Sequence, residues 1–205
     1  MFLQLNGPIL VIGAHPDDSE LMAGGLIHRA ISNGVDVYSV VMSDGAENGE
    51  RATREKEARR AARVLGIKEV HFCGLRDGMI SHNIETVKLI DAFIEDIRPG
   101  IIITHSTDDT HQDHKTVSNI TLSSVRHRHN IVLMGETPTS YFNDNLVYFD
   151  ITDSLGMKMK ALKVYTSQIK DGPIKMRQVR TLAVYRGQKI GTQYAEAFKN
   201  WRMVL

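Results

Sequence analysis

"PILVIGAHPDDSE" (residues 8–20) joins an apolar run to a dense group of charged residues. The run "PILVI" has the length and apolar character of a strand that is covered on both faces. A histidine, a proline and two adjacent aspartates follow at once, and such side chains seldom enter a core. "SELMAGGLIHRAISNG" (residues 19–34) then places apolar residues near helical spacing and ends close to a glycine. The stretch therefore predicts a buried strand, a polar turn and a helix.

The same alternation of strand-like and helix-like segments continues along the chain. Further strands are expected at residues 36–43, 69–74, 101–106, 130–136 and 145–152, and further helices at residues 51–66, 82–100, 111–128, 153–169 and 174–191. This order predicts an α/β fold, a Rossmann-like three-layer sandwich with a mostly parallel central sheet. No linker, repeat or low-complexity segment interrupts it, so we expect one domain over residues 1–205.

The composition is that of an ordinary globular protein, with 42% hydrophobic and 24% charged residues and a net charge of +1. A charge so close to zero argues against a nucleic-acid partner. The single cysteine, Cys73, excludes an internal disulfide and a zinc site built from several thiolates. No apolar run approaches the roughly 20 residues of a membrane span. The N-terminus also lacks the basic start of a signal peptide, so we expect a cytoplasmic protein.

Polar clusters follow the first, second and fourth predicted strands, at residues 14–20, 43–49 and 104–114. In open parallel sheets, ligands bind beyond the carboxyl ends of the strands. The first and fourth strands can both lie near the centre of the sheet. Across one crevice we therefore expect the side chains of His15, Asp17 and Asp18 to face those of His111, Asp113 and His114.

Two kinds of site could use this crevice. A dinucleotide site needs a G-x-G-x-x-G turn, but only Gly13 is in place and the two aspartates would repel a phosphate. Two histidines and a carboxylate with an open position for water form a catalytic zinc arrangement. His111 and His114 are three residues apart and would share a helix face. Each cluster alone could be a solvated turn or an exposed helix start, but together they favour a metal-dependent hydrolase.

Other polar residues have simpler interpretations. Arg126 and Arg128 could meet a phosphate or form a solvated helix end, and we favour the helix end. Cys73 is expected to be a buried, small apolar residue. Five histidines lack acidic neighbours at ligand spacing and are interpreted as surface or core residues: His28, His71, His82, His127 and His129.

Several motifs together resemble the PIG-L/LmbE-like de-N-acetylases over nearly the whole chain. They are "AHPDDSE" and "HQDH", the helix "TREKEARRAARVLG", the loop "GLRDG", and the C-terminal segments "KALKVYTSQ" and "YRGQKIGTQYAEAF". The resemblance implies an LmbE-like fold and a zinc-dependent hydrolase that removes the acetyl group from an N-acetylglucosamine-type sugar conjugate. It also implies a small-molecule substrate, and the Fe²⁺ ion could occupy the same ligands as zinc.

The resemblance also implies roles for individual residues. His15, Asp18 and His114 would hold the metal, and Asp17 would be the general base that activates its water. His111 would stabilise the tetrahedral oxyanion and would be oriented by Asp113. Arg54, Asp77 and Tyr194 would contact the sugar. Gly45 and Glu47 could line the pocket or form a plain turn.

Two alternative functions stay open. The first is a metal-dependent amidohydrolase that acts on a non-sugar amide. The second is a non-catalytic protein that binds a metal or a sugar. Because small enzymes of this kind often assemble, we also expect a homo-oligomer.

Overall fold

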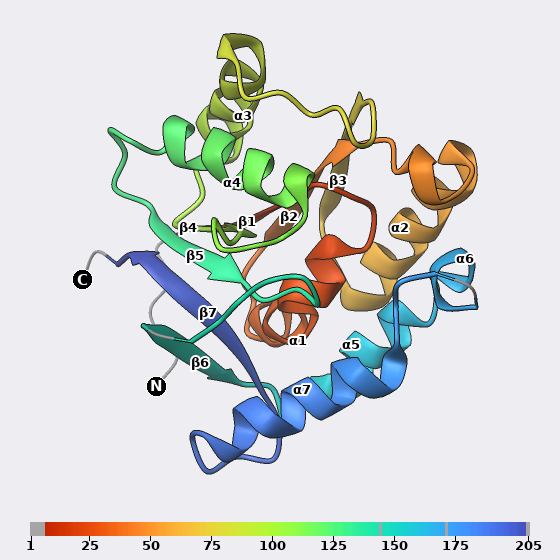
Figure 1. Ribbon diagram of the computed structural model, residues 1–205. Helices are drawn as coiled ribbons and strands as arrows, with labels where there is room; N and C mark the ends of the chain where they lie inside the picture. Colours follow the sequence, from red (N-terminus) through yellow and green to blue (C-terminus); the bar gives the residue numbers. More distant parts are fainter. Residues whose placement is uncertain (1–6, 144, 171, 204–205) are drawn as a thin grey trace.

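The computed structural model describes residues 7–143, 145–170 and 172–203. Residues 1–6, on which the expectation of no signal peptide partly rests, lie outside the described residues. All the described strands belong to one seven-stranded sheet in the order β3-β2-β1-β4-β5-β7-β6 (Figure 1). The strands are β1 (Ile9–Gly13), β2 (Val37–Ser43), β3 (Glu69–Leu75), β4 (Ile101–His105), β5 (Ile131–Gly135), β6 (Leu146–Asp150) and β7 (Ala195–Arg202).

The sheet is mostly parallel, as predicted. β1 to β5 run parallel to one another, whereas β7 pairs antiparallel with both β5 and β6. Because β1 pairs with β4 as well as with β2, strands far apart in the sequence lie side by side at the centre of the sheet.

Helices cover both faces of the sheet and give three layers (Figure 1). One face carries α1 (Asp18–Ser32), α2 (Arg51–Leu65) and α5 (Leu155–Leu162), and the other carries α3 (Ile84–Ile97) and α4 (Gln112–Ser124). The remaining helices are the single turn η1 (Ala46–Asn48), α6 (Thr166–Ile169) and α7 (Met176–Gln188). In the part of the chain that the structure describes, no helix is long and apolar enough to cross a membrane.

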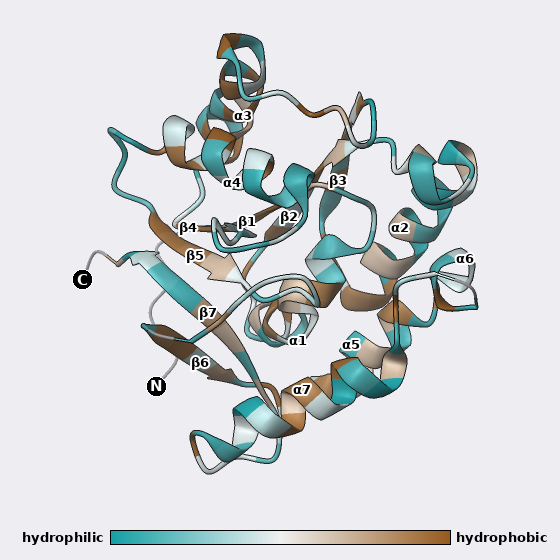
Figure 2. Ribbon diagram, viewed as in Figure 1, coloured by the Kyte–Doolittle hydropathy of each residue, from teal (hydrophilic) through white to brown (hydrophobic). Residues whose placement is uncertain are grey.

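The central strands are apolar along their length because both of their faces are buried. Alternate residues of β1 enter different cores: Ile9 and Val11 pack with α1 and α2, whereas Leu10 and Ile12 pack with α3 and α4. Figure 2 shows the same continuous hydrophobic colouring over most of β5. The α/β sandwich predicted from the sequence is therefore confirmed.

The structure departs from the expected elements in two places. The helix expected at residues 153–169 is divided into α5 and α6. The chain turns at Tyr165, whose hydroxyl donates a 3.0 Å hydrogen bond to the buried Glu20. The second departure is β7, which was not expected as a strand. Its sequence "AEAFKNWR" places the charged Glu196 on a buried surface, which masks the strand pattern.

Candidate active site

The site lies at the carboxyl ends of β1 and β4, where the order of connections reverses around β1. The turn after β1 and the loop after β4 meet there, as the sequence predicts. His15 Nε2 lies 3.3 Å from Asp113 Oδ2, and His114 Nε2 lies 3.5 Å from Asp18 Oδ1. The two polar clusters therefore form one constellation, although about a hundred residues separate them in the sequence.

The two adjacent aspartates point to different partners because of the backbone between β1 and α1. Asp17 has a left-handed φ of 118°, which is strained for a residue that is not glycine. The Asp17 carboxylate meets Arg54, whose Nη1 lies 3.2 Å from Oδ2. Asp18 turns back under the strand and accepts a 2.7 Å hydrogen bond from the His15 amide. Its Cβ passes so close to Gly13 that a side chain at residue 13 would clash with it.

His15 lies among three carboxylates. Its Nε2 is 3.0 Å from Asp77 Oδ1 and 3.3 Å from Asp113 Oδ2, and its Nδ1 is 3.5 Å from Asp18 Oδ2. Burial opposes the charged form of the ring, but these three carboxylates outweigh it and raise the pKa of His15 to about 12. The position therefore favours positive charge, which a ring proton or a bound cation would supply.

His114 is oriented through its other ring nitrogen. Its Nδ1 lies 3.0 Å from Asp109 Oδ2, and Asp109 also accepts a 2.7 Å hydrogen bond from the Thr137 hydroxyl. Although burial opposes it, the bonds from His114 and the His111 amide hold the pKa of Asp109 below its ordinary value. A charged Asp109 accepts a hydrogen bond from the Nδ1–H of His114. The Nε2 atom of His114 then carries no proton and can bind a metal.

Asp18 is supported by a histidine that has no counterpart in the predicted site. His105, the last residue of β4, is fully buried, and its Nε2 lies 3.0 Å from Asp18 Oδ2. Its ring also stacks on His114, with the centroids 3.9 Å apart. Burial would raise the pKa of Asp18, but His105 and His114 hold it well below its usual range. The arrangement keeps Asp18 ionised, as a metal ligand must be.

The described residues contain several overlapping sets that could hold a metal ion. Three sets bring their donor atoms within 4.8 Å of one another: His15, His111 and His114; Asp18, His105 and His114; His15, Asp77 and Asp113. A catalytic metal needs an open position for substrate, and the His105 side chain has 0% exposure. His105 therefore suits support of Asp18 rather than ligation. The predicted ligands His15, Asp18 and His114 are spread over these sets and do not form one of them, although Asp18 lies 3.5 Å from each of the two histidines. Their nitrogen and oxygen donors are of the kinds that zinc and ferrous iron bind.

His111 is the N-cap residue of α4, and its ring is held by the backbone of the helix. Its Nδ1 accepts a 3.2 Å hydrogen bond from the Asp113 amide, so the neutral ring carries its proton on Nε2 as a free donor. Burial, followed by the charges of His114 and His15, lowers the pKa of His111 and favours this neutral form. The Asp113 carboxylate was expected to orient His111, but its described contacts are with the Gly78 amide at 2.8 Å and with His15. The backbone of Asp113, rather than its side chain, makes the observed contact with His111.

Asp17 has the properties of a general base. It is 6% exposed, and burial raises its pKa to about 6, against the opposing charge of Arg54. A carboxylate with a pKa near neutrality accepts and returns a proton more readily than an ordinary aspartate. Arg54 was expected to contact the sugar, and the contact that the structure shows is with the carboxylate of Asp17.

A hollow of about 110 Å³ opens over these residues, and it includes most of the predicted site. It is lined by His15, Asp17, Asp18, Arg54, Asp77, His111 and His114, together with residues of the later loops such as Asn48, Gln168 and Ile174. Glu47 is exposed and contributes its amide to Asp77 at 3.1 Å. Arg128 pairs with Asp91 and Glu95 of α3, in keeping with a solvated helix end.

Tyr194 is not brought to this hollow. It precedes β7, which lies beyond β5 in the sheet, and packs beside Ile151, Leu155 and Ala183. Its hydroxyl accepts a 2.6 Å hydrogen bond from Arg180. Tyr194 therefore lies outside the hollow that His15, Arg54 and Asp77 line, and its expected contact with the sugar stays a prediction.

His105 and Asp109 are the site residues that sequence reasoning missed. His105 is the last residue of an apolar strand, and a histidine in such a strand more often packs in the core. Asp109 lies in a run of polar residues, "STDDT", that does not reveal which aspartate turns inward. A usable signal existed for both, since His105 ends the strand and Asp109 lies in the following loop, five residues before His114 of α4.

Comparisons with known proteins connect the chain to one family. Residues 10–125 match the PIG-L family, described as GlcNAc-PI de-N-acetylase. The chain is similar to the diacetylchitobiose deacetylase of Thermococcus kodakarensis, with 27% identity over 93% of this chain and 82% of that protein. It is also similar to YaiS of Escherichia coli, an uncharacterized deacetylase, with 30% identity over 78% of this chain and 90% of that protein.

A solved structure shows the same fold. The N,N'-diacetylchitobiose deacetylase from Pyrococcus horikoshii, complexed with its inhibitor MPG, superimposes with a TM-score of 0.80. The two sequences are 25% identical, and the match covers 94% of this chain and 83% of that one. The similarity extends past the strands that carry the site into the C-terminal third of the chain.

Proposed function

The chain belongs to the PIG-L family of de-N-acetylases, and from that premise we propose that it removes the N-acetyl group from an N-acetylglucosamine-type sugar conjugate in a metal-dependent hydrolysis. One observation carries the proposal. Beside a base-like Asp17, the ends of β1 and β4 bring together two histidines and a carboxylate with ligand chemistry. The names of the relatives supply the substrate class.

The metal would be held by His15, Asp18 and His114. The supporting partners of these residues suit that role, because Asp109 fixes His114 and His105 lies against Asp18. When bound, zinc or ferrous iron would lower the pKa of a water toward about 7 and polarise the amide carbonyl. Zinc is the metal that we propose first, since two histidines and one carboxylate with an open position form a catalytic zinc arrangement.

Three side chains would have separate roles in the hydrolysis. Asp17 accepts a proton from the attacking water at a carboxylate oxygen and returns it to the nitrogen of the leaving amine. The Nε2–H of His111 donates a hydrogen bond to the oxyanion that develops on the former carbonyl. Arg54 keeps Asp17 aimed, and its charge limits the rise of the Asp17 pKa.

Replacement of Asp17 by asparagine tests this assignment. Asp17→Asn keeps the size of the side chain, and asparagine tolerates a left-handed backbone. We expect kcat to fall by about 10²- to 10⁴-fold, which is the usual contribution of a general base. The metal content per chain, measured by mass spectrometry, should stay at the wild-type level. Asp36→Asn, at an exposed site, is the control, and wild-type turnover by Asp17→Asn would remove Asp17 from the mechanism.

A further inference from the structure

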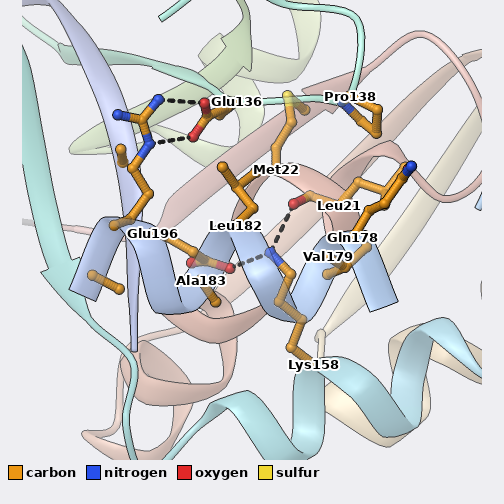
Figure 3. Close-up of a pocket in the computed structure, with 13 residues that line it drawn as sticks. Leu21, Met22, Glu136, Pro138, Lys158, Gln178, Val179, Leu182, Ala183 and Glu196 are labelled. Atoms are coloured by element: carbon orange, nitrogen blue, oxygen red, sulfur yellow. Dashed lines mark hydrogen bonds and ion pairs between the residues drawn. The ribbon is translucent and has the colours of Figure 1, made fainter. Parts of the chain in front are cut away.

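A second hollow, larger than the first, lies beside the candidate active site. Its volume is about 330 Å³, and Figure 3 shows the residues that line it. The walls come from α1, the loop after β5, α5, α7 and β7. No residue with a proposed part in the hydrolysis lines it, so the proposed mechanism leaves it unexplained.

The two hollows share part of their walls. Leu21 and Pro138 line both of them, and Figure 3 shows these two side chains at the same side of the larger hollow. Leu21 belongs to the first turn of α1, one turn after Asp17. Pro138 stands between Thr137 and Thr139, which contact Asp109 and His114. The two hollows are therefore neighbours, and Leu21 and Pro138 form the boundary that they share.

The charged groups around the larger hollow are already satisfied by the protein. Lys158 Nζ lies 2.7 Å from Glu196 Oε1 and donates a 2.8 Å hydrogen bond to the Leu21 carbonyl (Figure 3). Glu196 also accepts hydrogen bonds from two amides of α1. Glu136 and Arg186 form a two-pronged ion pair. Since these groups have their partners, they do not call for a charged ligand.

The remaining lining residues are mostly small or apolar. Ala183, Ala195 and Ala197 leave space where α7 crosses β7, and the larger side chains around them are Leu21, Met22, Val179 and Leu182. Pockets that bind small molecules are predominantly apolar and measure about 300–1,000 Å³. The larger hollow falls within this range by itself, whereas the hollow over the proposed catalytic residues, at about 110 Å³, lies below it.

We propose that the larger hollow binds an uncharged, apolar aglycone of the sugar conjugate, an alkyl or aryl group, while the N-acetyl sugar lies over His15 and His114. This inference rests on the proposed function for the position of the sugar and adds a preference at its other end. It predicts that the substrate carries a hydrophobic group, whereas the two diacetylchitobiose deacetylases described above are named for a substrate whose second unit is also a sugar.

Binding without turnover tests the hollow by itself. Methyl and hexyl β-glucosides carry no amide, and their affinities for the full-length protein are measured by calorimetry. Each methylene that leaves water raises the affinity about fourfold. We therefore expect the hexyl compound to bind at least about tenfold more tightly than the methyl compound. Ala183→Leu should fill the hollow and remove most of this gain. Thr181→Leu, exposed on the same helix, adds a similar side chain outside the hollow and should keep the gain.

A second variant guards against a folding defect. Leu182 is only partly buried, so Leu182→Glu places a charge in the hollow at a position that tolerates it, with Thr181→Glu as the matched control. Thermal melting followed by circular dichroism verifies that each variant is folded. Equal affinities of the wild type for the methyl and hexyl compounds, or an unchanged gain in both hollow variants, would overturn the proposal.

Kinetics then separate this proposal from the function on which it rests. With metal-loaded enzyme, kcat/KM for hexyl N-acetylglucosaminide should exceed kcat/KM for the methyl glycoside by about tenfold or more. The two variants in the hollow, Ala183→Leu and Leu182→Glu, should reduce this ratio of hexyl to methyl kcat/KM. A gain in affinity without acetate release would support the hollow and contradict the deacetylase. Acetate release with the same kcat/KM for both glycosides would support the deacetylase and contradict the hollow.

Discussion

Asp18 shows how much of the site depends on single residues outside the ligand set. Its two oxygens are approached by the His15 amide, His105 and His114. The sequence predicts His15, Asp18 and His114 because their motifs place them at strand ends, where sites form. It does not predict His105 or the inward turn of Asp109, because these contacts arise only when β4 and its loop pack against α1 and α4.

At this scale, we expect His105 to govern the affinity for the metal. Partners that hold a metal ligand typically change affinity or activity by 10- to 100-fold when they are removed. His105→Leu should therefore weaken zinc binding by about that factor, measured by competition with a chromogenic chelator. His105→Gln keeps a polar atom near the position of Nε2 and should recover part of the loss. If His105→Leu bound zinc as the wild type does, His105 would be a packing residue only.

At the scale of elements, α1 links the candidate site to the rest of the fold. It carries Asp18 at its first turn, and glycines in its middle let α5 and the end of β6 approach closely. The sequence predicts α1 and the other helices of its layer from the spacing of their apolar residues alone. It does not predict β7, because Glu196 becomes acceptable in the interior only through the bonds that α1 and α5 supply.

Two glycine substitutions test this packing. A Cβ at Gly25 would lie 2.7 Å from Ile151 Cγ2, whereas a Cβ at Gly156 would meet nothing within 4 Å. We expect Gly25→Ala to lower the free energy of unfolding by about 1–3 kcal/mol through overpacking. Gly156→Ala should raise it by about 0.5 kcal/mol, because alanine is the better helix former. Urea denaturation measures both, and a stabilised Gly25→Ala variant would show that the close contact with Ile151 is wrong.

At the scale of the whole molecule, the buried pair of Lys158 and Glu196 joins α1, α5 and β7. The side chains are 6% and 5% exposed and their charged atoms lie 2.7 Å apart. Most of the order of strands and helices could be predicted from the sequence because each unit is local, but β7 and the division between α5 and α6 could not. The link between α1, α5 and β7 could not be predicted, because α1 lies near the start of the sequence and α5 and β7 lie near its end. The expectations of one domain, a homo-oligomer and a cytoplasmic location remain predictions.

Removal of Lys158 should weaken the whole fold. Lys158→Met leaves the Glu196 carboxylate buried without its cation, and such a loss typically costs about 3–5 kcal/mol of unfolding free energy. Lys68→Met breaks an exposed pair whose side chains are 53% and 54% exposed, so stability should hardly change. Urea denaturation compares the two. Equal stabilities would mean that the Lys158–Glu196 pair does not hold the C-terminal strand to α1.

The central claim is that the site at the ends of β1 and β4 is a metal-dependent deacetylase. The most direct measurement is acetate release from N-acetylglucosamine conjugates and from non-sugar amides, before chelation, after chelation and after the return of zinc or ferrous iron. We expect release from the sugar conjugates, loss with the chelator and recovery with the metal. Release from non-sugar amides alone would contradict the sugar assignment. If none of these compounds released acetate while one metal ion was bound per chain, a binding role would replace the hydrolase.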